Sequence, residues 1–394
     1  MHRAVPCQRA AATFMLHHVP NAHLQARNIP NRIPLAFQFK RALSSDRNND
    51  RCASRRGVLP HTQRIVHKPR LSRDLGVRVE AQAEVQTLSD VLKERGVTDE
   101  QFSLILERNP DVVNSSIREE VIPRLNYMQY LHEKGEFFGE SVADYITRQP
   151  SCLEQRFEEI YSDERYVAIR KPYYTRHDTP RGWGRPRYEK RYEGDTSAEE
   201  WLQERYPDVH IRFCHQIDFA TEGVLLAAKT QAAAGAVGKL FSSRSNKKQY
   251  LAIVFGHPAS DEWTIDAPIT KDEDCPKGFS MKIAAEGEEG KQSQTQVEVL
   301  ARGTLALEGP HKGKPASKVL VRPLSGRRHQ IRLHLQLSGH SIVGDAAYSE
   351  DRDSHRMFLL AHALHVPLKE RPLDLHVPEP AAWRRALHTG VEDP

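Results

Sequence analysis

The apolar residues of this 394-residue chain change their spacing near residue 158, and this change restricts the folds that the chain can adopt. Between residues 86 and 157 they recur at the spacing of amphipathic helices. Residues 158–384 instead hold short runs typical of strands, with few helices and no regular alternation of strands with long helices. The pattern predicts an α+β fold with a mixed, largely antiparallel sheet flanked by helices, preceded by a small helical domain.

The predicted helical domain contains an internal repeat. The heptapeptide LILERNP at 104–110 has a counterpart in DYITRQP at 144–150, so the repeat has a period of about forty residues. A period of this length indicates stacked helix pairs. Thr98 begins a capping box, Thr-Asp-Glu-Gln, ahead of the first of these helices. The segment 86–157 resembles the mitochondrial transcription termination factor family, whose helical repeats bind nucleic acid. A small helical domain docked on the rest of the chain is the alternative interpretation.

Positive charge is concentrated at the start of the chain. Of the 57 Lys and Arg and the 52 Asp and Glu, residues 1–80 hold 15 and 4, which leaves 42 and 48 for residues 81–394. No acid precedes Asp46, and an arginine-rich, acid-poor stretch with interspersed apolar residues is typical of an organelle transit peptide. Residues 1–80 are therefore predicted to be a transit peptide and a disordered linker. The mitochondrion is the expected destination, with plastid and cytoplasm as alternatives, and a basic arm that binds RNA is the competing interpretation.

The composition excludes several other classes of protein. The sequence has no run of about 18 apolar residues, so no membrane partner is predicted. Its five cysteines are scattered, without a Cys-x-x-Cys pair. This argues against a disulfide framework or a cysteine-rich zinc site and fits a reducing compartment. The chain is expected to be monomeric.

Cations and aromatic residues are interleaved between Lys171 and Tyr192. Phosphates pair with cationic side chains and unstacked bases lie on aromatic rings, so this basic stretch is predicted to contact RNA. The candidate contacts are Arg185, Arg187, Lys190 and Arg191. A solvated charged loop is the simpler alternative, but the contrast with an acidic body favours RNA.

One carboxylate, Asp218, interrupts an otherwise apolar and small-residue stretch, RFCHQIDFATEGVLLAAK at 212–229. A turn residue would explain it. Two further motifs follow, KKQYLAIVFG at 247–256 and LSGRRHQIRLHLQLSGHSIVGDAAY at 324–348. In this order the three motifs resemble those of the RluA family of pseudouridine synthases, over roughly residues 158–384. The variant HQ-hydrophobic-D, preceded by Phe-Cys, resembles the branch of eukaryotic RNA pseudouridylate synthase domain-containing proteins.

This resemblance implies a pseudouridine-synthase fold and an RNA pseudouridine synthase that isomerises uridine in rRNA or tRNA without a metal or other cofactor. It implies that Asp218 is the catalytic carboxylate, acting as nucleophile or base. Tyr250 would stack on the target base, and Arg332, expected on a strand, would pair with Asp218. The implied substrate contacts are His215, Gln216, Ile331 and Leu333, of which the last two would line the base pocket. A non-catalytic RNA-binding or RNA-folding factor is the competing hypothesis.

The sequence departs from the family pattern at two positions. Gln216 stands where the family usually has an arginine that is linked to replacing the flipped base, and Glu222 stands where it usually has serine. If Gln216 replaces the flipped base less effectively than that arginine, uridines that are already unpaired would be favoured as substrates. The closing RMFLLAHALHVPL resembles the last core strand, EPAAWRRAL is predicted to form a terminal helix, and residues 385–394 are predicted to be a tail.

Overall fold

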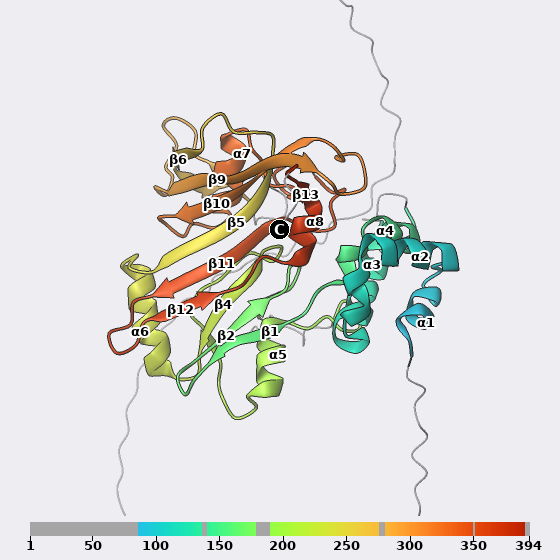
Figure 1. Cartoon of the computed structure of the whole chain (residues 1–394). Coiled ribbons are helices and arrows are strands. Elements are labelled where there is room, and N and C mark those ends of the chain that lie inside the picture. Colours follow the sequence, from blue (N-terminus) through green and yellow to red (C-terminus); the bar gives the residue numbers. More distant parts are fainter. Residues whose placement is uncertain (1–85, 136–139, 179–189, 276–279, 350, 391–394) are drawn as a thin grey trace, which may run out of the picture. The chain divides into compact units, whose positions relative to one another are not determined.

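The computed structural model describes residues 86–135, 140–178, 190–275, 280–349 and 351–390 (Figure 1). These residues belong to one unit that begins at Glu80. The predicted transit peptide and linker lie outside the described residues. In the described part, no helix is long and apolar enough to cross a membrane.

Four α-helices form the N-terminal part of the described chain: α1 Leu88–Lys93, α2 Asp99–Arg108, α3 Ile122–Glu133 and α4 Val142–Arg148. A π-helical turn, Ile117–Val121, leads into α3. The capping box predicted at Thr98 is present, because its side chain accepts from the Gln101 N–H while Gln101 bonds back to the Thr98 N–H. These helices enclose a hydrophobic core of their own, which includes Leu92, Ile105 and Leu125.

The two heptapeptides adopt the same local structure. Helix α2 ends at Arg108 and α4 at Arg148, and the residue that follows each, Asn109 or Gln149, has a non-helical backbone. A proline then starts a 3-10 helix, Pro110–Asn114 or Pro150–Leu153. Proline suits the first position of a helix because it has no N–H to leave unpaired. Gln101 of α2 bonds Asp144 of α4 at 2.9 Å, so the two repeat helices pack on each other.

The rest of the chain forms a sheet whose strand order is β1-β2-β4-β11-β5-β10-β9-β13, with β12 on β11, β3 on β4 and β6 on β9. Among these pairs only β4 with β11 is parallel. The strands are β1 Glu158–Ser162, β2 Tyr166–Lys171, β3 Arg212–Phe213, β4 Glu222–Ala228, β5 Lys247–Phe255, β6 Glu262–Asp266, β9 Gln294–Leu305, β10 Pro315–Pro323, β11 Leu359–Val366, β12 Leu373–His376 and β13 Leu387–His388. A separate ribbon pairs β7 Ile269–Lys271 with β8 Met281–Ile283. The predicted mixed, largely antiparallel sheet is confirmed.

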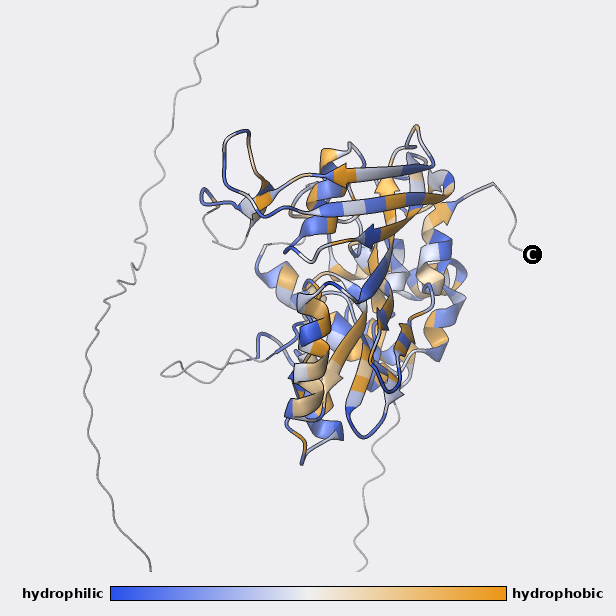
Figure 2. Ribbon diagram, turned by 90° about the vertical axis from the view of Figure 1, so that its left-hand side faces the viewer, coloured by the Kyte–Doolittle hydropathy of each residue, from blue (hydrophilic) through white to orange (hydrophobic). Residues whose placement is uncertain are grey.

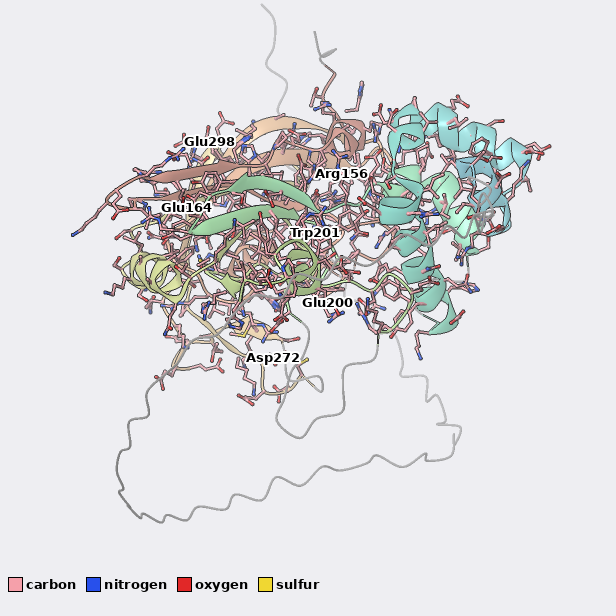
Figure 3. The ribbon with its side chains drawn as sticks, turned by 90° about the horizontal axis from the view of Figure 1, so that it is seen from below. Arg156, Glu164, Glu200, Trp201, Asp272 and Glu298 are labelled. Carbon is pink, nitrogen blue, oxygen red and sulfur yellow. The ribbon has the colours of Figure 1, made fainter. Side chains whose placement is uncertain are left out.

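Helices cover the sheet on both faces, as expected for an α+β fold. They are α5 Ala198–Arg205, α6 Gln231–Ser242, α7 Gln330–Leu337 and α8 Ala381–Ala386. Every residue of β4 is buried, because Leu226 packs with Val237 of α6 on one face and Leu225 with Leu202 of α5 on the other. Strand β12 instead alternates buried and exposed residues, and Figure 2 shows hydrophobic and hydrophilic residues interspersed along the ribbon. On α5, Trp201 stacks on Phe157 with ring centroids 5.2 Å apart (Figure 3).

Two predictions about local structure are wrong. The run HQIRLH begins α7 at Gln330 instead of forming a strand, because Ile331 and Leu335, four residues apart, lie on one helix face and pack into the core. The predicted tail does not begin at residue 385, since β13 pairs with Leu305 and Thr304 of β9. Fully buried Trp383 of α8 holds the chain against the core just before this strand.

Candidate active site

A cavity of about 1510 Å³ opens where several elements of the sheet end. Its wall comes from the loop between β3 and β4, from β5, from the loop that precedes α7, and from the turn at 344–347. Asp218, Tyr250, Arg332, Ile331, His215 and Gln216 all line it. Six of the residues singled out from the sequence are therefore brought together.

Asp218 lies in the loop between β3 and β4, next to the N-terminal end of a fully buried strand. Its carbonyl oxygen accepts the Thr221 N–H at 3.1 Å, which closes a turn. The preceding residue, Ile217, is buried and donates its N–H to His177 Nε2 at 3.2 Å. The backbone is thus fixed on both sides of Asp218, while its side chain retains 24% of its exposure at the cavity wall.

Arg332 connects Asp218 to a second carboxylate. Its Nη1 lies 3.3 Å from Asp218 Oδ2, and its Nε and Nη2 donate to the two oxygens of Asp345 at 2.8 and 2.7 Å. Burial alone would lower the pKa of the Arg332 guanidinium, but the hydrogen bonds and charge of Asp345, with the charge of Asp218, raise this pKa above its ordinary value. Arg332 is thereby held as a cation beside Asp218.

Asp345 was not predicted as a site residue, although it lies within the quoted motif VGDAAY. Its carboxylate accepts the N–H groups of Ala347 and Tyr348 and is 2% exposed as a side chain. Bidentate pairing with an arginine fixes the plane of the guanidinium, so Asp345 orients Arg332 towards Asp218. The sequence signal for this role was the position of Asp345 directly after Gly344, in the same quoted motif as Arg332.

Tyr250 projects from β5 into the same cavity. Burial, together with the nearby charge of Asp218, raises the pKa of its phenol above the ordinary tyrosine value. The side chain is therefore a neutral phenol at physiological pH, which suits a ring that stacks on a base.

His329 is a second residue that the sequence analysis did not assign to the site. Its Nε2 lies 4.0 Å from Asp218 Oδ1, and its Nδ1 is hydrogen bonded to the Tyr348 hydroxyl. Burial lowers the pKa of His329 to about 4, against the opposing charge of Asp218, so the ring is neutral at physiological pH. The residue has φ 57, a left-handed conformation, directly before α7.

The four predicted substrate contacts differ in their surroundings. Gln216 is exposed at the rim of the cavity and Ile331 lines its wall. His215 lines it too, but its Nε2 accepts the Leu226 N–H at 3.0 Å and its ring stacks on Phe241, so it also supports the loop. Leu333 is buried and is not part of the wall, which contradicts the prediction, because successive residues of a helix point in different directions.

The predicted basic loop is only partly described. Arg185 and Arg187 lie outside the described residues, and Lys190 is exposed. Arg191 forms an ion pair with Asp195 at 3.0 Å, and its guanidinium carbon lies 5.6 Å from the ring centre of Phe219, which follows Asp218 in the loop between β3 and β4. Other cations line the cavity itself and were not predicted, although four of them belong to the quoted motifs, because the sequence does not show that the two motifs meet at one cavity: Arg244, Lys247, Lys248, Arg327 and Arg328.

Lys171 does not belong to an RNA-contacting surface, although the sequence placed it at the start of the basic stretch. The residue is fully buried, and its ammonium donates to the carbonyl oxygens of Pro172, Thr175 and Phe219 at 2.8, 2.9 and 3.3 Å. Burial lowers the pKa of Lys171 to about 7. Its function is to tie the end of β2 to the loop that carries Asp218.

Glu222, which replaces the usual serine, is buried at the start of β4 between two arginines. It accepts hydrogen bonds from Arg170 and Arg356. Burial raises the pKa of Glu222, but the charges of Arg356 and Arg170 outweigh it and lower the pKa below the ordinary value. The carboxylate therefore stabilises the base of the loop as an anion.

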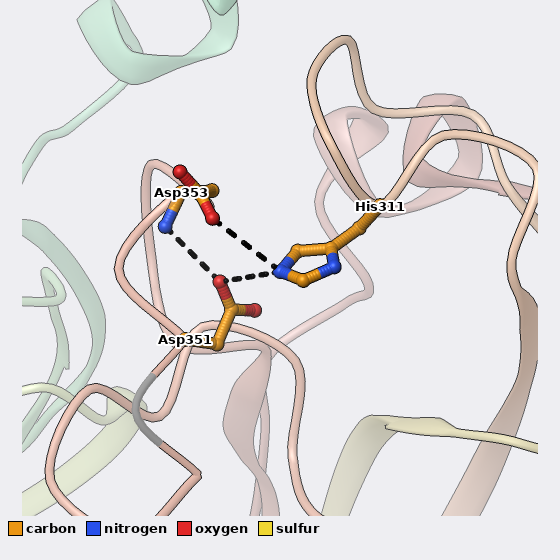
Figure 4. Close-up of side chains that lie close together, drawn as sticks. All are labelled: His311, Asp351 and Asp353. Atoms are coloured by element: carbon orange, nitrogen blue, oxygen red, sulfur yellow. Dashed lines mark hydrogen bonds and ion pairs between the residues drawn. The ribbon is translucent and has the colours of Figure 1, made fainter. Parts of the chain in front are cut away.

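One group of side chains in the described residues has the spacing of metal ligands (Figure 4). His311 Nε2 lies 3.2 Å from Asp351 Oδ1 and 3.6 Å from Asp353 Oδ2. The oxygens of Asp351 already accept hydrogen bonds, among them the Gly344 N–H at 2.7 Å. Asp351 thus holds the turn that carries Asp345, and these contacts explain the group without a metal.

Known proteins resemble this chain over the part that carries the site. Residues 165–337 match the family described as RNA pseudouridylate synthase. RNA pseudouridylate synthase domain-containing protein 1 of Danio rerio is 35% identical over 245 residues, or 59% of this chain and 77% of that protein. Dual-specificity RNA pseudouridine synthase RluA of Escherichia coli (strain K12) is 34% identical over 163 residues, 41% of this chain and 68% of that protein. The structure of human RNA pseudouridylate synthase domain containing 1 matches with a TM-score of 0.50 and 30% identity, covering 60% of this chain and 90% of that one.

Proposed function

This chain belongs to the RNA pseudouridylate synthase family, and from this premise we propose that it modifies structured rRNA or tRNA in the mitochondrion. The reaction itself, isomerisation of uridine in RNA to pseudouridine, follows from the family. The observation that carries the site assignment is the chain of contacts Asp218–Arg332–Asp345 on the wall of a cavity that also contains Tyr250.

Pseudouridine formation breaks the bond between N1 of the base and C1′ of the ribose. The base then turns and its C5 bonds to C1′, while the C5 proton leaves and N1 gains a proton, so that atoms and electrons balance without a redox step. The chain supplies a carboxylate, Asp218, as nucleophile towards the sugar or as base. Arg332 donates to that carboxylate, and Tyr250 provides a neutral ring against the base.

The cavity suits an RNA segment better than a free nucleoside. It is open, its volume is about 1510 Å³, and its wall includes exposed Arg244, Lys247 and Arg328. Drug-sized pockets are about 300–1,000 Å³, so space remains for nucleotides on either side of the uridine. Cations at the rim would pair with the phosphates of those nucleotides.

The mitochondrial location is supported by the composition of the first 80 residues, which hold 15 Lys and Arg against 4 Asp and Glu. A reporter fused to residues 1–80 is expected to enter mitochondria. A uniformly cytosolic reporter would contradict this part of the proposal and leave the reaction unaffected.

The substrate is tested by mapping pseudouridines across the transcriptome with and without the protein. Sites in mitochondrial rRNA or tRNA should disappear with the protein and return with wild-type chain but not with Asp218→Asn. Lost sites that lie only in cytosolic RNA would overturn the substrate assignment. If cells that lack the protein grow poorly, and the Asp218→Ala protein restores their growth, an RNA-folding role separate from catalysis would be favoured instead.

The resemblance of residues 86–157 to mitochondrial transcription termination factor repeats supports a second, narrower proposal, in which these helices add to RNA binding. Two units with the same helix, break and 3-10 helix are consistent with it. Removal of the exposed cations Lys134 and Arg118 from this segment should then weaken RNA binding.

A further inference from the structure

Phe219 is an exposed aromatic residue directly after the catalytic Asp218. Its relative exposure is 39%, whereas Ile217 on the other side of Asp218 is 8% exposed. The residue also lines the cavity. A single exposed apolar side chain is ordinary on a protein surface, so it is the place of Phe219, on the cavity wall directly after Asp218, that points to contact with the substrate.

The backbone of Phe219 is held firmly although its ring is exposed. Its carbonyl oxygen accepts the Thr175 N–H at 3.1 Å and the Lys171 ammonium at 3.3 Å. Both donors belong to the end of β2 and the segment after it. The ring is therefore carried on a fixed backbone instead of a mobile loop.

One side of the Phe219 ring rests on other aromatic residues. The ring of Tyr174 lies 5.8 Å away and is inclined by 38°. Tyr174 has φ 50, an uncommon conformation for a tyrosine, and its ring is in turn 6.0 Å from Tyr127 of α3 and 5.6 Å from Tyr173. These rings are inclined to one another, so they form an aromatic cluster that ends in an exposed ring beside the Asp218 carboxylate.

A uridine inside a stacked RNA must leave the stack before C1′ and C5 can meet Asp218 and Tyr250. Extrusion breaks the stacking of the uridine on its two neighbours and its base pair, and it costs a few kcal/mol. Proteins that open a stack commonly insert an apolar side chain between the bases that remain. The exposed polar residue of the same loop, Gln216, cannot replace that stacking with apolar contact.

We propose that Phe219 fills the position vacated by the extruded uridine and stacks on the neighbouring base, so that the protein can act on uridines within stacked RNA. The ring belongs to the residue directly after the carboxylate that must meet the sugar. Its contact with the Tyr174 ring holds it in place when a base stacks on it. Leu324, also exposed on the cavity wall, has no ring to stack and is therefore the weaker candidate.

The test compares two RNA substrates that carry the same target uridine, one in a paired stem and one in a single strand, under single-turnover conditions. Phe219→Ala should slow tritium release from carbon-5-labelled uridine at least about tenfold more for the stem than for the single strand, because the variant has no ring to stack on a base. Phe219→Trp should retain the wild-type ratio of the two rates. Leu300→Ala, which removes an exposed apolar side chain of β9 outside the cavity wall, is the matched control.

A second readout separates stacking from chemistry. A 2-aminopurine next to the target uridine in the stem is quenched by stacking, so it should stay quenched when the Asp218→Asn protein binds and should brighten when the Asp218→Asn, Phe219→Ala protein binds. Equal losses of rate on the two substrates would show that Phe219 only supports the catalytic loop, and an unchanged rate on the stem would show that it is dispensable. Either outcome would overturn the proposal while the isomerase activity of the wild-type protein remained.

Discussion

At the residue scale, we expect turnover to depend on the carboxylate of Asp218, which lies on the cavity wall beside Arg332. Replacing it with Asn retains the turn, because the turn is closed by the Asp218 backbone carbonyl and Asn accepts the same backbone angles. The amide is neither a nucleophile nor a base, so turnover should fall by several orders of magnitude. The measurement is tritium release from carbon-5-labelled uridine in RNA, with RNA binding measured in parallel.

The control for this substitution is Asp208→Asn, which changes an exposed carboxylate that is not on the cavity wall. It should leave turnover unchanged. RNA affinity should change little in both variants, because phosphate contacts dominate it. An Asp218→Asn protein that binds RNA and turns over at the wild-type rate would show that another group performs the chemistry.

Because Lys171 is buried, we expect the stability of the folded protein to depend on pH. Its pKa is lowered to about 7 in the folded protein from 10.5, so the unfolded chain binds more protons between these values. The free energy of unfolding contributed by this group should therefore rise with pH above 7, by at most about 1.4 kcal/mol per pH unit, and level off near the unfolded pKa.

Urea unfolding at pH 7, 8 and 9 measures this slope. The wild-type curve should rise more steeply with pH than that of Lys171→Met, although the variant is less stable throughout because three carbonyl oxygens lose their donor. Parallel curves would mean that the ammonium stays charged when it is buried.

At the element scale, the helical segment is joined to the catalytic sheet by buried contacts. Arg124 of α3 donates to the Cys152 carbonyl at 3.0 Å and reaches the His355 carbonyl at 3.4 Å. Its guanidinium carbon lies 4.7 Å from the ring centre of Tyr127 and 4.9 Å from that of Tyr173. Since His355 belongs to the sheet domain, the docked-domain interpretation of these helices is supported by direct hydrogen bonding.

Arg124→Met should lower the free energy of unfolding by about 2–4 kcal/mol, because two carbonyls lose a donor and the rings lose a cation. Hydrogen exchange should accelerate in α3 and around His355 together. Arg118→Met, at an exposed position nearby, is the control and should change neither. Faster exchange confined to α3 would indicate that the helices and the sheet are not coupled through this residue.

The elements also show which parts of the fold a sequence predicts. The motif KKQYLAIVFG combines strand composition with the family resemblance, and it forms β5. HQIRLH was not, because an apolar residue at every second position over six residues fits a strand, while the residues that decide for a helix lie further along at Leu335. Burial of Lys171, and the pairing of Arg332 with Asp345 as well as Asp218, depend on three-dimensional contacts that no local pattern specifies.

At the scale of the whole molecule, an acidic body must bind a polyanion. Residues 81–394 hold 42 Lys and Arg, from a total of 57 less 15, against 48 Asp and Glu, from 52 less 4. Net attraction to RNA therefore requires cations gathered near the site, and Arg244, Lys247 and Arg328 are exposed and line the cavity. Local patches of this kind steer a charged ligand even when the total charge opposes it.

Replacing these three residues with Ala should weaken RNA binding and reduce its dependence on salt. Removing one cation that pairs with a phosphate should lower the slope of log affinity against log salt by about 0.7–0.9. The control replaces Lys314, Lys369 and Arg371, which are exposed cations away from the cavity wall, and should leave the slope unchanged. A third variant, with Arg185, Arg187 and Lys190 replaced, tests the basic stretch predicted from the sequence. A lower slope in the third variant alone would place the phosphate contacts on that stretch, and an equal reduction in the control would mean that RNA is held by diffuse charge instead of by the rim of the active site.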